Sequence, residues 1–541
     1  VVRILFRMST DPSAPDGANA RRAAASEPGE PAGPARRAAH SNSFSGSLGW
    51  TVLGAVIPGL GLWRAGRRVA GGIIMGLFIV LVGGAATLFL TSRKAVENLV
   101  LAQQGMLQNV AIALLVLAVL WVAVIGVSHL ALRPSRPSVG QRAAGALVVG
   151  ALSFIVAAPM AVGANVAWIA GTTLDSLVGG SDDNTPDSTQ PTINVQDPWA
   201  NKDRLNFLIL GGDSGTGSGR SASVGMRADT VIVASIDTHT GATTLFTLPR
   251  NAEKMPFPPN SPLHKYYPNG FTSPSANPSL YERSQYLLNA MYRDVPARVP
   301  HDVLGKTKDF GASAMKVSVG YALGLDIDYF VKINMDGFKD FINAIGGITL
   351  NVNYRIPMGG QTDANIAPGG YIEPGPNKHM MGGTALWYAR GRYHLDDYKR
   401  MERQRCVINA VVQQTTPETV LTNFQSIAAA GEKTITTDVP RNLLADLVDL
   451  GMKVKNTKLR SVVFDPQNGF NSPNPNWTDV RKKVQRALKE TAAGVEATAT
   501  PTPTGTDSAS PSTSASPTTK ATTKAKSDDL DYTCGYHPGK G

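Results

Sequence analysis

The charged run at 388–405, YARGRYHLDDYKRMERQR, has residue types and spacing that suit the binding of a polyanion. Asp397, Arg400 and Gln404 recur at intervals of three and four residues, so a helix would place them on one face. Two arginines precede that helix at alternate positions, Arg390 and Arg392. Guanidinium groups bind phosphate oxygens bidentately, and carboxylates bind divalent ions. The run therefore predicts a diphosphate site with a divalent ion, and a solvated helix face is the plainer alternative.

A second group of charges brackets two apolar runs in the stretch MRADTVIVASIDTHTGATTLFTLPRN at 226–251. Arg227 lies two residues before Asp229, so both side chains would point to the same side of an extended chain. Arg250 directly follows the second run. We interpret these residues as phosphate and metal ligands. The alternative is a surface ion pair, which is worth less than about 1 kcal/mol.

A glycine-rich turn, GGDSG at 211–215, ends a third apolar run and contains Asp213. Ligands of α/β proteins bind at the carboxyl ends of strands, and glycine lets backbone N–H groups approach a phosphate. Asp213 is therefore a candidate ligand, although an Asx turn would also explain it.

These candidates need a sheet and covering helices to bring them together. Apolar runs at 206–212, 229–237 and 242–249 predict buried strands. Helical patterns occur at 279–293, 311–323, 383–388, 397–414, 441–452 and 477–490. Strands that alternate with helices predict one α/β domain at 201–492, with helices on both faces of its sheet.

The chain before this domain contains stretches long and apolar enough to cross a membrane. Within a membrane region at 47–174, the predicted spans lie near 69–92, 108–132 and 144–171. Arginines cluster before the first span and between the second and third, which places both clusters in the cytoplasm and the domain outside.

A shorter apolar piece at 47–63 is broken by Pro58 and four glycines, and we interpret it as interfacial or re-entrant. If it were a fourth span, either the arginine clusters or the domain would lie on the wrong side of the membrane. Three spans are therefore preferred.

The remaining segments have compositions that cannot form a core. They are a disordered cytoplasmic N-terminus at 1–46, a polar linker at 175–200 and a Ser/Thr/Pro-rich tail at 493–541. VVRILFR precedes Met8, which we expect to be the true start.

The formal net charge of +11 would also suit a nucleic-acid partner. A domain outside the cell without RRM, zinc-finger or helix-turn-helix signatures argues against one. A phosphate-bearing membrane lipid is the better candidate.

The chain has two cysteines, Cys406 and Cys534, too few for a disulfide scaffold. Cys406 is most simply a buried thiol. A disulfide between the two outside the cell is the alternative.

Five motifs in series resemble the LytR-CpsA-Psr family, in its actinobacterial form with several N-terminal spans. They are GGDSG, RADT, LPRN, IGGITLNV and ALWYARGRYHLDDYKRMERQRC. The resemblance covers about 206–414, and more weakly extends to about 490. It implies a membrane-anchored α/β/α sandwich with an apolar groove for a polyprenyl chain. It also implies a Mg²⁺-dependent phosphotransferase that moves a glycopolymer from undecaprenyl diphosphate to a peptidoglycan hydroxyl. A diphosphatase and a non-catalytic lipid-diphosphate receptor are the alternatives.

Residue by residue, the resemblance assigns three roles in this sequence. The metal ligands are Asp213 and Asp229. The diphosphate ligands are Arg227, Arg250, Arg390, Arg392, Arg400 and Gln404. The catalytic residues are Asp229, Arg250 and Asp397, with either aspartate as the base for the acceptor hydroxyl.

The sequence departs from the family pattern at two positions. Asn251 stands where many members have an acid, and Leu287 stands where many have a lysine. Lys265 and Lys316 are candidate substitutes for that lysine. Apolar side chains could line the groove, although an ordinary core needs such residues in any case. They are Phe330, Val331, Ile333, Phe338, Phe341 and Ile342.

Overall fold

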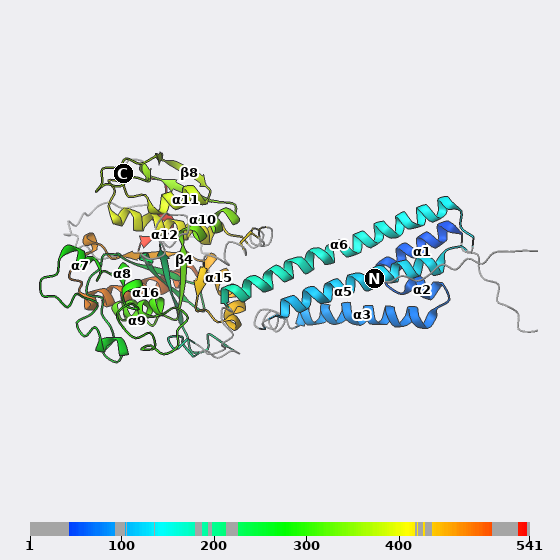
Figure 1. The fold of residues 1–541 in the computed structure, drawn as a ribbon, viewed down its shortest axis with the longest axis horizontal. Helices are drawn as coiled ribbons and strands as arrows, with labels where there is room; N and C mark the ends of the chain where they lie inside the picture. Colours follow the sequence, from blue (N-terminus) through cyan, green and yellow to red (C-terminus); the bar gives the residue numbers. More distant parts are fainter. Residues whose placement is uncertain are drawn as a thin grey trace, which may run out of the picture.

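The computed structural model describes residues 43–91, 103, 105–134, 136–178, 187–192, 197–212, 226–416, 419, 423, 426–427, 435–499 and 528–537. These residues form a bundle of apolar helices and an α/β domain (Figure 1). The long helix α6 (Val139–Val178) reaches from the bundle to the domain.

Three helices of the bundle are long and apolar enough to cross a membrane. They are α3 (Arg68–Thr91), α5 (Met106–Leu132) and α6. Leu77, Leu90 and Leu147 are among their many exposed apolar side chains, as expected of helices that face lipid. Each predicted span overlaps one of these helices.

The broken apolar piece forms two short helices inside the bundle, α1 (Phe44–Val56) and α2 (Leu60–Arg64). Thr51 Oγ1 lies 3.2 Å from His129 Nδ1, and Trp121 Nε1 donates a 3.0 Å hydrogen bond to the Ala55 carbonyl. The second half of α1 therefore packs against α5 between His129, near the end of α5, and Trp121, near its middle. Its 13 residues span about 20 Å, which is less than a hydrocarbon core of about 30 Å. This packing fits a re-entrant piece.

The α/β domain is built on a seven-stranded sheet with strand order β11-β10-β3-β2-β1-β4-β9. Its strands are β1 (Arg204–Gly212), β2 (Ala228–Asp237), β3 (Thr243–Leu248), β4 (Tyr329–Asn334), β9 (Ile435–Thr437), β10 (Arg460–Val463) and β11 (Asp528–Asp529). Strands β1, β2 and β3 pair antiparallel, whereas β4 pairs parallel with β1 and β10 parallel with β3. Side chains alternate between the faces, so Leu208 and Leu210 point to one layer and Phe207 and Ile209 to the other.

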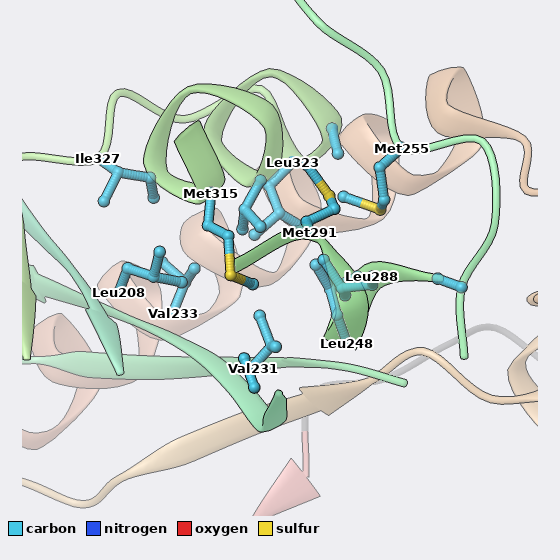
Figure 2. Packing of buried hydrophobic residues seen from close by; sticks show 14 of the residues in the cluster. Leu208, Val231, Val233, Leu248, Met255, Leu288, Met291, Met315, Leu323 and Ile327 are labelled. Atoms are coloured by element: carbon cyan, nitrogen blue, oxygen red, sulfur yellow. The ribbon is translucent and has the colours of Figure 1, made fainter. Parts of the chain in front are cut away.

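One face of the sheet is covered by α8 (Leu288–Asp294), α9 (Phe310–Leu323) and α16 (Trp477–Ala499) (Figure 1). Leu208, Val231 and Val233 of the sheet pack against Met291 and Met315 of these helices (Figure 2). All five side chains are buried, so this layer forms the main core.

The other face is covered by α10 (Met335–Ala344), α11 (Gly382–Arg390), α12 (Asp397–Gln414) and α15 (Leu444–Lys455). The domain is therefore an α/β/α sandwich with a mixed sheet, which confirms the predicted fold class. Two ribbons pack on this layer, β5 (Ile348–Val352) with β8 (Gly375–Met380) and β6 (Ile356–Met358) with β7 (Gly370–Ile372). The remaining short helices are α7 (Leu280–Ser284), α17 (Leu530–Thr533), η2 (Pro262–Lys265), η3 (Arg441–Leu443) and η4 (Pro466–Asn468).

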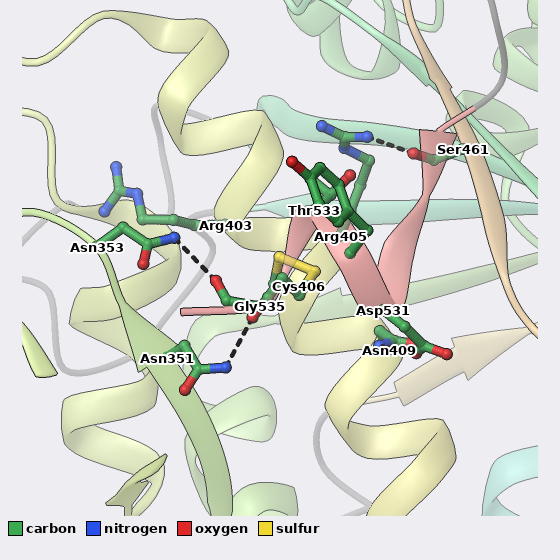
Figure 3. The surroundings of a disulfide bond; sticks show 12 residues. Asn351, Asn353, Arg403, Arg405, Cys406, Asn409, Ser461, Asp531, Thr533 and Gly535 are labelled. Atoms are coloured by element: carbon green, nitrogen blue, oxygen red, sulfur yellow. Dashed lines mark hydrogen bonds between the residues drawn. A yellow bond between two sulfur atoms is a disulfide. The ribbon is translucent and has the colours of Figure 1, made fainter. Parts of the chain in front are cut away.

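The last described segment, 528–537, is fastened to the domain (Figure 3). A disulfide joins Cys534 to Cys406 of α12, and β11 adds an edge strand beside β10. Asn351 and Asn353 donate hydrogen bonds of 2.9 and 3.1 Å to backbone carbonyls of this segment. The interpretation of Cys406 as a buried thiol was therefore wrong, and this part of the predicted tail belongs to the domain.

Other boundaries differ less from the predictions. The single helix expected at 279–293 is two helices, α7 and α8, because Leu287 has extended backbone with ψ 157°. Helix α16 continues to Ala499, past the expected domain end at 492.

Candidate active site

A pocket of 1480 Å³ lies between the sheet and the layer of α10, α11 and α12. Charged residues line it at one end of the strands, where β1 ends and β2 begins. Apolar side chains line the rest. The pocket thus combines a cationic end with an apolar end.

Three separate elements place the predicted catalytic residues at the cationic end. Asp229 lies at the start of β2, and Arg250 follows β3. Asp397 is the first residue of α12, whose N-terminus is capped by the Asp396 carboxylate, 2.7 Å from Lys399 N. Because β2 and β3 are antiparallel neighbours, the start of one lies beside the end of the other.

Arg250 joins the two aspartates. Its Nη1 lies 2.8 Å from Asp229 Oδ1, and its Nε lies 3.4 Å from Asp397 Oδ1. Asp397 also pairs with Arg400 at 2.9 Å and with Arg392 at 3.9 Å. Charges that are far apart in the sequence therefore form one network.

The network holds its groups in their charged forms. Burial by itself would raise the pKa of Asp229, but Arg250, helped by Arg400 and a hydrogen bond from Asn289, lowers it below the usual value. Burial lowers the pKa of Arg400 to about 10, although the neighbouring Asp397 carboxylate favours the charged form. At neutral pH the site therefore presents the Asp229 carboxylate and a poorly hydrated Arg400 guanidinium, which an anion would stabilise.

The remaining predicted phosphate ligands also line the pocket: Arg227, Arg390, Arg392 and Gln404. Arg227 Nη2 donates to Gln285 Oε1 at 3.2 Å, and the Arg390 guanidinium lies 4.9 Å from the Trp387 ring centre. The structure thus brings together every predicted site residue that it describes. Asp213 lies outside the described residues, so its role as a metal ligand stays a prediction.

Several buried polar atoms of this site have no hydrogen-bond partner among the described residues. They are Asn289 Oδ1, Arg400 Nε and Gln404 Oε1. Buried polar groups are rarely left unsatisfied without a reason. These buried donors and acceptors without a partner indicate that a polar ligand binds here.

Two residues that the sequence analysis missed support the site. Asn289 is 5% exposed; its Nδ2 lies 3.2 Å from Asp229 Oδ1, and its backbone N donates to the Arg250 carbonyl at 2.9 Å. Gln285 contacts Arg227 from the break between α7 and α8. Asn289 lies two residues after Leu287, the position at which the sequence departs from the family by lacking a lysine.

The carboxylates fit a divalent ion in the manner of Mg²⁺, which typically takes one or two protein carboxylates beside phosphate oxygens and water. Asp229 Oδ1 accepts hydrogen bonds from Arg250 and Asn289, which leaves Oδ2 available. In the part of the chain that the structure describes, no three His, Cys, Asp or Glu residues form a metal cluster.

The candidate substitutes for the missing lysine do not lie in the pocket. Lys316 is buried and pairs with Asp438 at 2.6 Å, so it supports the domain interior. Lys265 lies on η2, outside the pocket lining. Both suggestions were wrong. Asn251, in contrast, does line the pocket.

Four of the six proposed groove residues line the pocket: Val331, Ile333, Phe338 and Phe341. Phe330 and Ile342 are fully buried and belong to the core. For the three residues on β4, this split follows the alternation of side chains along the strand; the other three lie on α10.

This architecture defines a class of protein: an α/β/α domain, anchored by apolar helices, with a pocket that is arginine-rich at one end and apolar at the other. Residues 177–491 match the model of the LytR_cpsA_psr family. The match covers more than half of the chain, which therefore belongs to this family, as the resemblance implied.

Two relatives are named polyisoprenyl-teichoic acid–peptidoglycan teichoic acid transferase TagU. The Enterococcus faecalis protein is 27% identical over 351 residues, which are 64% of this chain and 95% of that protein. The Bacillus cereus protein is 28% identical over 159 residues, which are 29% of this chain and 49% of that protein. A solved structure of the Streptococcus agalactiae protein gbs0355 has 22% sequence identity and a TM-score of 0.38, and covers 53% of this chain and 88% of that one.

Proposed function

We propose that this protein is a phosphotransferase that moves a glycopolymer from a polyprenyl-diphosphate carrier to peptidoglycan, at the outer face of the membrane. The observation that carries the proposal is the single pocket whose arginine-lined end adjoins an apolar end. A polyprenyl diphosphate has this same division into a polyanionic head and an apolar chain. The TagU relatives are named as transferases of teichoic acid to peptidoglycan.

In the proposed reaction, the acceptor hydroxyl oxygen bonds to the phosphorus that carries the glycopolymer. The bond from that phosphorus to the bridging oxygen breaks, and polyprenyl phosphate leaves. The hydroxyl proton passes to Asp397 or Asp229, both of which contact Arg250. The arginines hold the phosphate oxygens and stabilise the charge that develops on the leaving group.

Mg²⁺ is part of the proposal. Asp229 would hold it, together with Asp213 as predicted from the sequence. When bound, the ion would help to neutralise the leaving phosphate.

The disulfide supports an outer location for the domain, because such bonds persist in oxidising compartments. If the N-terminus is in the cytoplasm, three membrane crossings would place the C-terminal end of α6, and the domain that follows it, outside. A reporter fused after residue 178 should then be active only outside the cell.

The direct test incubates residues 187–541 with a polyprenyl-diphosphate glycan, Mg²⁺ and peptidoglycan. This fragment keeps Cys534, which a fragment ending at 499 would lose. We expect glycan transfer that Arg250→Ala and Asp229→Ala abolish. Arg355→Ala is the matched control, because Arg355 forms an exposed ion pair with Glu373 away from the pocket lining.

The outcomes distinguish the candidate functions. Phosphate-bond cleavage without transfer to any acceptor would indicate a diphosphatase. Binding without cleavage would indicate a receptor. A variant that unfolds would show that the replaced residue is structural.

A further inference from the structure

The outer end of α6 is tied to both the bundle and the domain. Asp175 lies two residues beyond the apolar span Val139–Thr173. Its Oδ2 accepts a 2.8 Å hydrogen bond from Gln108 of α5, and its Oδ1 pairs with Arg441 of η3. One carboxylate therefore links two membrane helices to the α/β domain. We call Gln108, Asp175 and Arg441 the junction.

The chain that follows α6 is also held on the domain. Asp187 accepts a 2.8 Å hydrogen bond from Lys308 N, and Ser188 N donates to the Lys306 carbonyl at 2.9 Å. Gln190 donates to the carbonyl of Asp438, just before η3. These contacts place α6 against one edge of the domain, where it also meets β9.

The junction lies on the side of the domain where the pocket is apolar. Arg441 is followed by Leu443 and Leu444, which pack in one cluster with Phe207 and Ile236. Phe207 and Ile236 also line the pocket, near the start of β1 and the end of β2.

The arginine-lined end lies at the opposite ends of the same strands, where Gly212 pairs with Ala228. Helix α12 follows the same direction, because its first residue, Asp397, is at the charged end and Val412 is at the apolar end. The 15 residue steps from Asp397 to Val412 correspond to about 22 Å of helix. The pocket therefore runs from the membrane-anchored side of the domain to the phosphate site.

We propose that the junction holds the domain in an orientation that turns the apolar end of the pocket toward the bilayer. The isoprenoid tail of a membrane-borne donor then passes from the bilayer into the pocket while its diphosphate reaches the arginines. Asp175 and Arg441 are thus positioning residues for a lipid donor. This inference rests on the proposed function and adds the route of the tail.

The test uses the full chain in proteoliposomes and two donors with the same glycan: a full-length polyprenyl diphosphate in the bilayer and a short-chain, water-soluble analogue. We expect Asp175→Ala to reduce transfer from the bilayer donor by about tenfold and transfer from the soluble donor by less than about twofold. The charge-reversed pair Asp175→Arg/Arg441→Asp should recover transfer from the bilayer donor. Glu373→Ala, which breaks an exposed ion pair with Arg355, is the matched control.

A second readout does not depend on activity. Both native cysteines are in the disulfide, so spin labels attach only to introduced cysteines. Labels at Val448 of α15 and Leu147 of α6, both exposed, report the distance between domain and bundle. We expect Asp175→Ala to broaden the distance distribution and the charge-reversed pair to restore it.

Equal losses with both donors, or no loss with either, would overturn the inference, as would an unchanged distance distribution. If the parent protein transfers glycan from neither donor, the proposed function fails. The spin-label distances then still decide whether the junction sets the orientation.

Discussion

The disulfide between α12 and the last described segment leads to a quantitative prediction. Cys406 and Cys534 are 128 residues apart. A cross-link that closes a loop of this length lowers the entropy of the unfolded chain by the equivalent of about 5 kcal/mol, and measured effects are typically about 2–4 kcal/mol. We therefore expect the double replacement Cys406→Ala/Cys534→Ala to reduce the free energy of unfolding by about 3 kcal/mol. Alanine is preferred to serine because Cys406 is buried and a hydroxyl there would need a partner.

The assay is thermal and urea unfolding of residues 187–541, followed by near-ultraviolet circular dichroism. For a domain of this size, about 3 kcal/mol corresponds to a fall in Tm of roughly 6–12 °C. Reductant should lower the Tm of the parent to that of the double variant and leave the variant unchanged. A double variant within about 0.5 kcal/mol of the parent would refute the reasoning, because the hydrogen bonds from Asn351 and Asn353 would then suffice to hold the segment.

Three further predictions concern single residues. Lys316→Met leaves the Asp438 carboxylate buried without its cation and should cost about 3–5 kcal/mol of stability in urea unfolding, whereas an unchanged midpoint would contradict the buried pair. The pKa of Asp229 is lower in the folded than in the unfolded protein, so the ionised carboxylate stabilises the fold. This contribution to the free energy of unfolding should be complete above the unfolded carboxyl pKa of about 4 and should disappear as pH falls through the folded-state pKa. The difference in urea midpoint between the parent and Asp229→Asn should therefore shrink as pH falls. A difference that stays constant with pH would show that the ionisation of Asp229 does not contribute to stability. Asn289→Ala removes the hydrogen bond that positions the Asp229 carboxylate, so it should lower kcat/KM about tenfold with little change in Tm. An unchanged kcat/KM would show that this hydrogen bond does not contribute to the reaction.

The sequence predicted the parts of the fold that local periodicity determines. Helix α12 was expected at 397–414 and lies at Asp397–Gln414, because its start is capped by Asp396 and its pattern is uninterrupted. The three long apolar helices were equally clear, since uninterrupted apolar runs of that length have few other structures available.

Features that depend on contacts between distant residues were harder to predict. The break at Leu287 has no glycine or proline to mark it, and it is this break that lets Gln285 reach Arg227 and α8 present Asn289 to Asp229. The position of Lys316 could not be read from its own segment either, because its partner lies more than a hundred residues later.

The candidate site also has features that the sequence predicts locally and features that depend on contacts between distant residues. Arg227, Asp229 and Arg250 could be selected because they bracket two apolar runs, and the residues of the charged run at 388–405 because of their spacing; their roles came from the family resemblance. Their arrangement around Arg250 required the pairing of β2 with β3 and the packing of α12 on the sheet, neither of which a motif encodes.

The disulfide also has a consequence for the time course of biosynthesis. Cys406 sits in the helix that carries Arg400 and Gln404, and its partner is made 128 residues later. At typical translation rates of 5–20 residues per second, about 6–26 s separate the synthesis of the two cysteines. During that interval the site helix lacks its covalent link, and the edge strand β11 does not yet exist. The domain can therefore form this link only after Cys534 has been made, and a ribosome that stops before it would leave a site helix with an unpaired thiol.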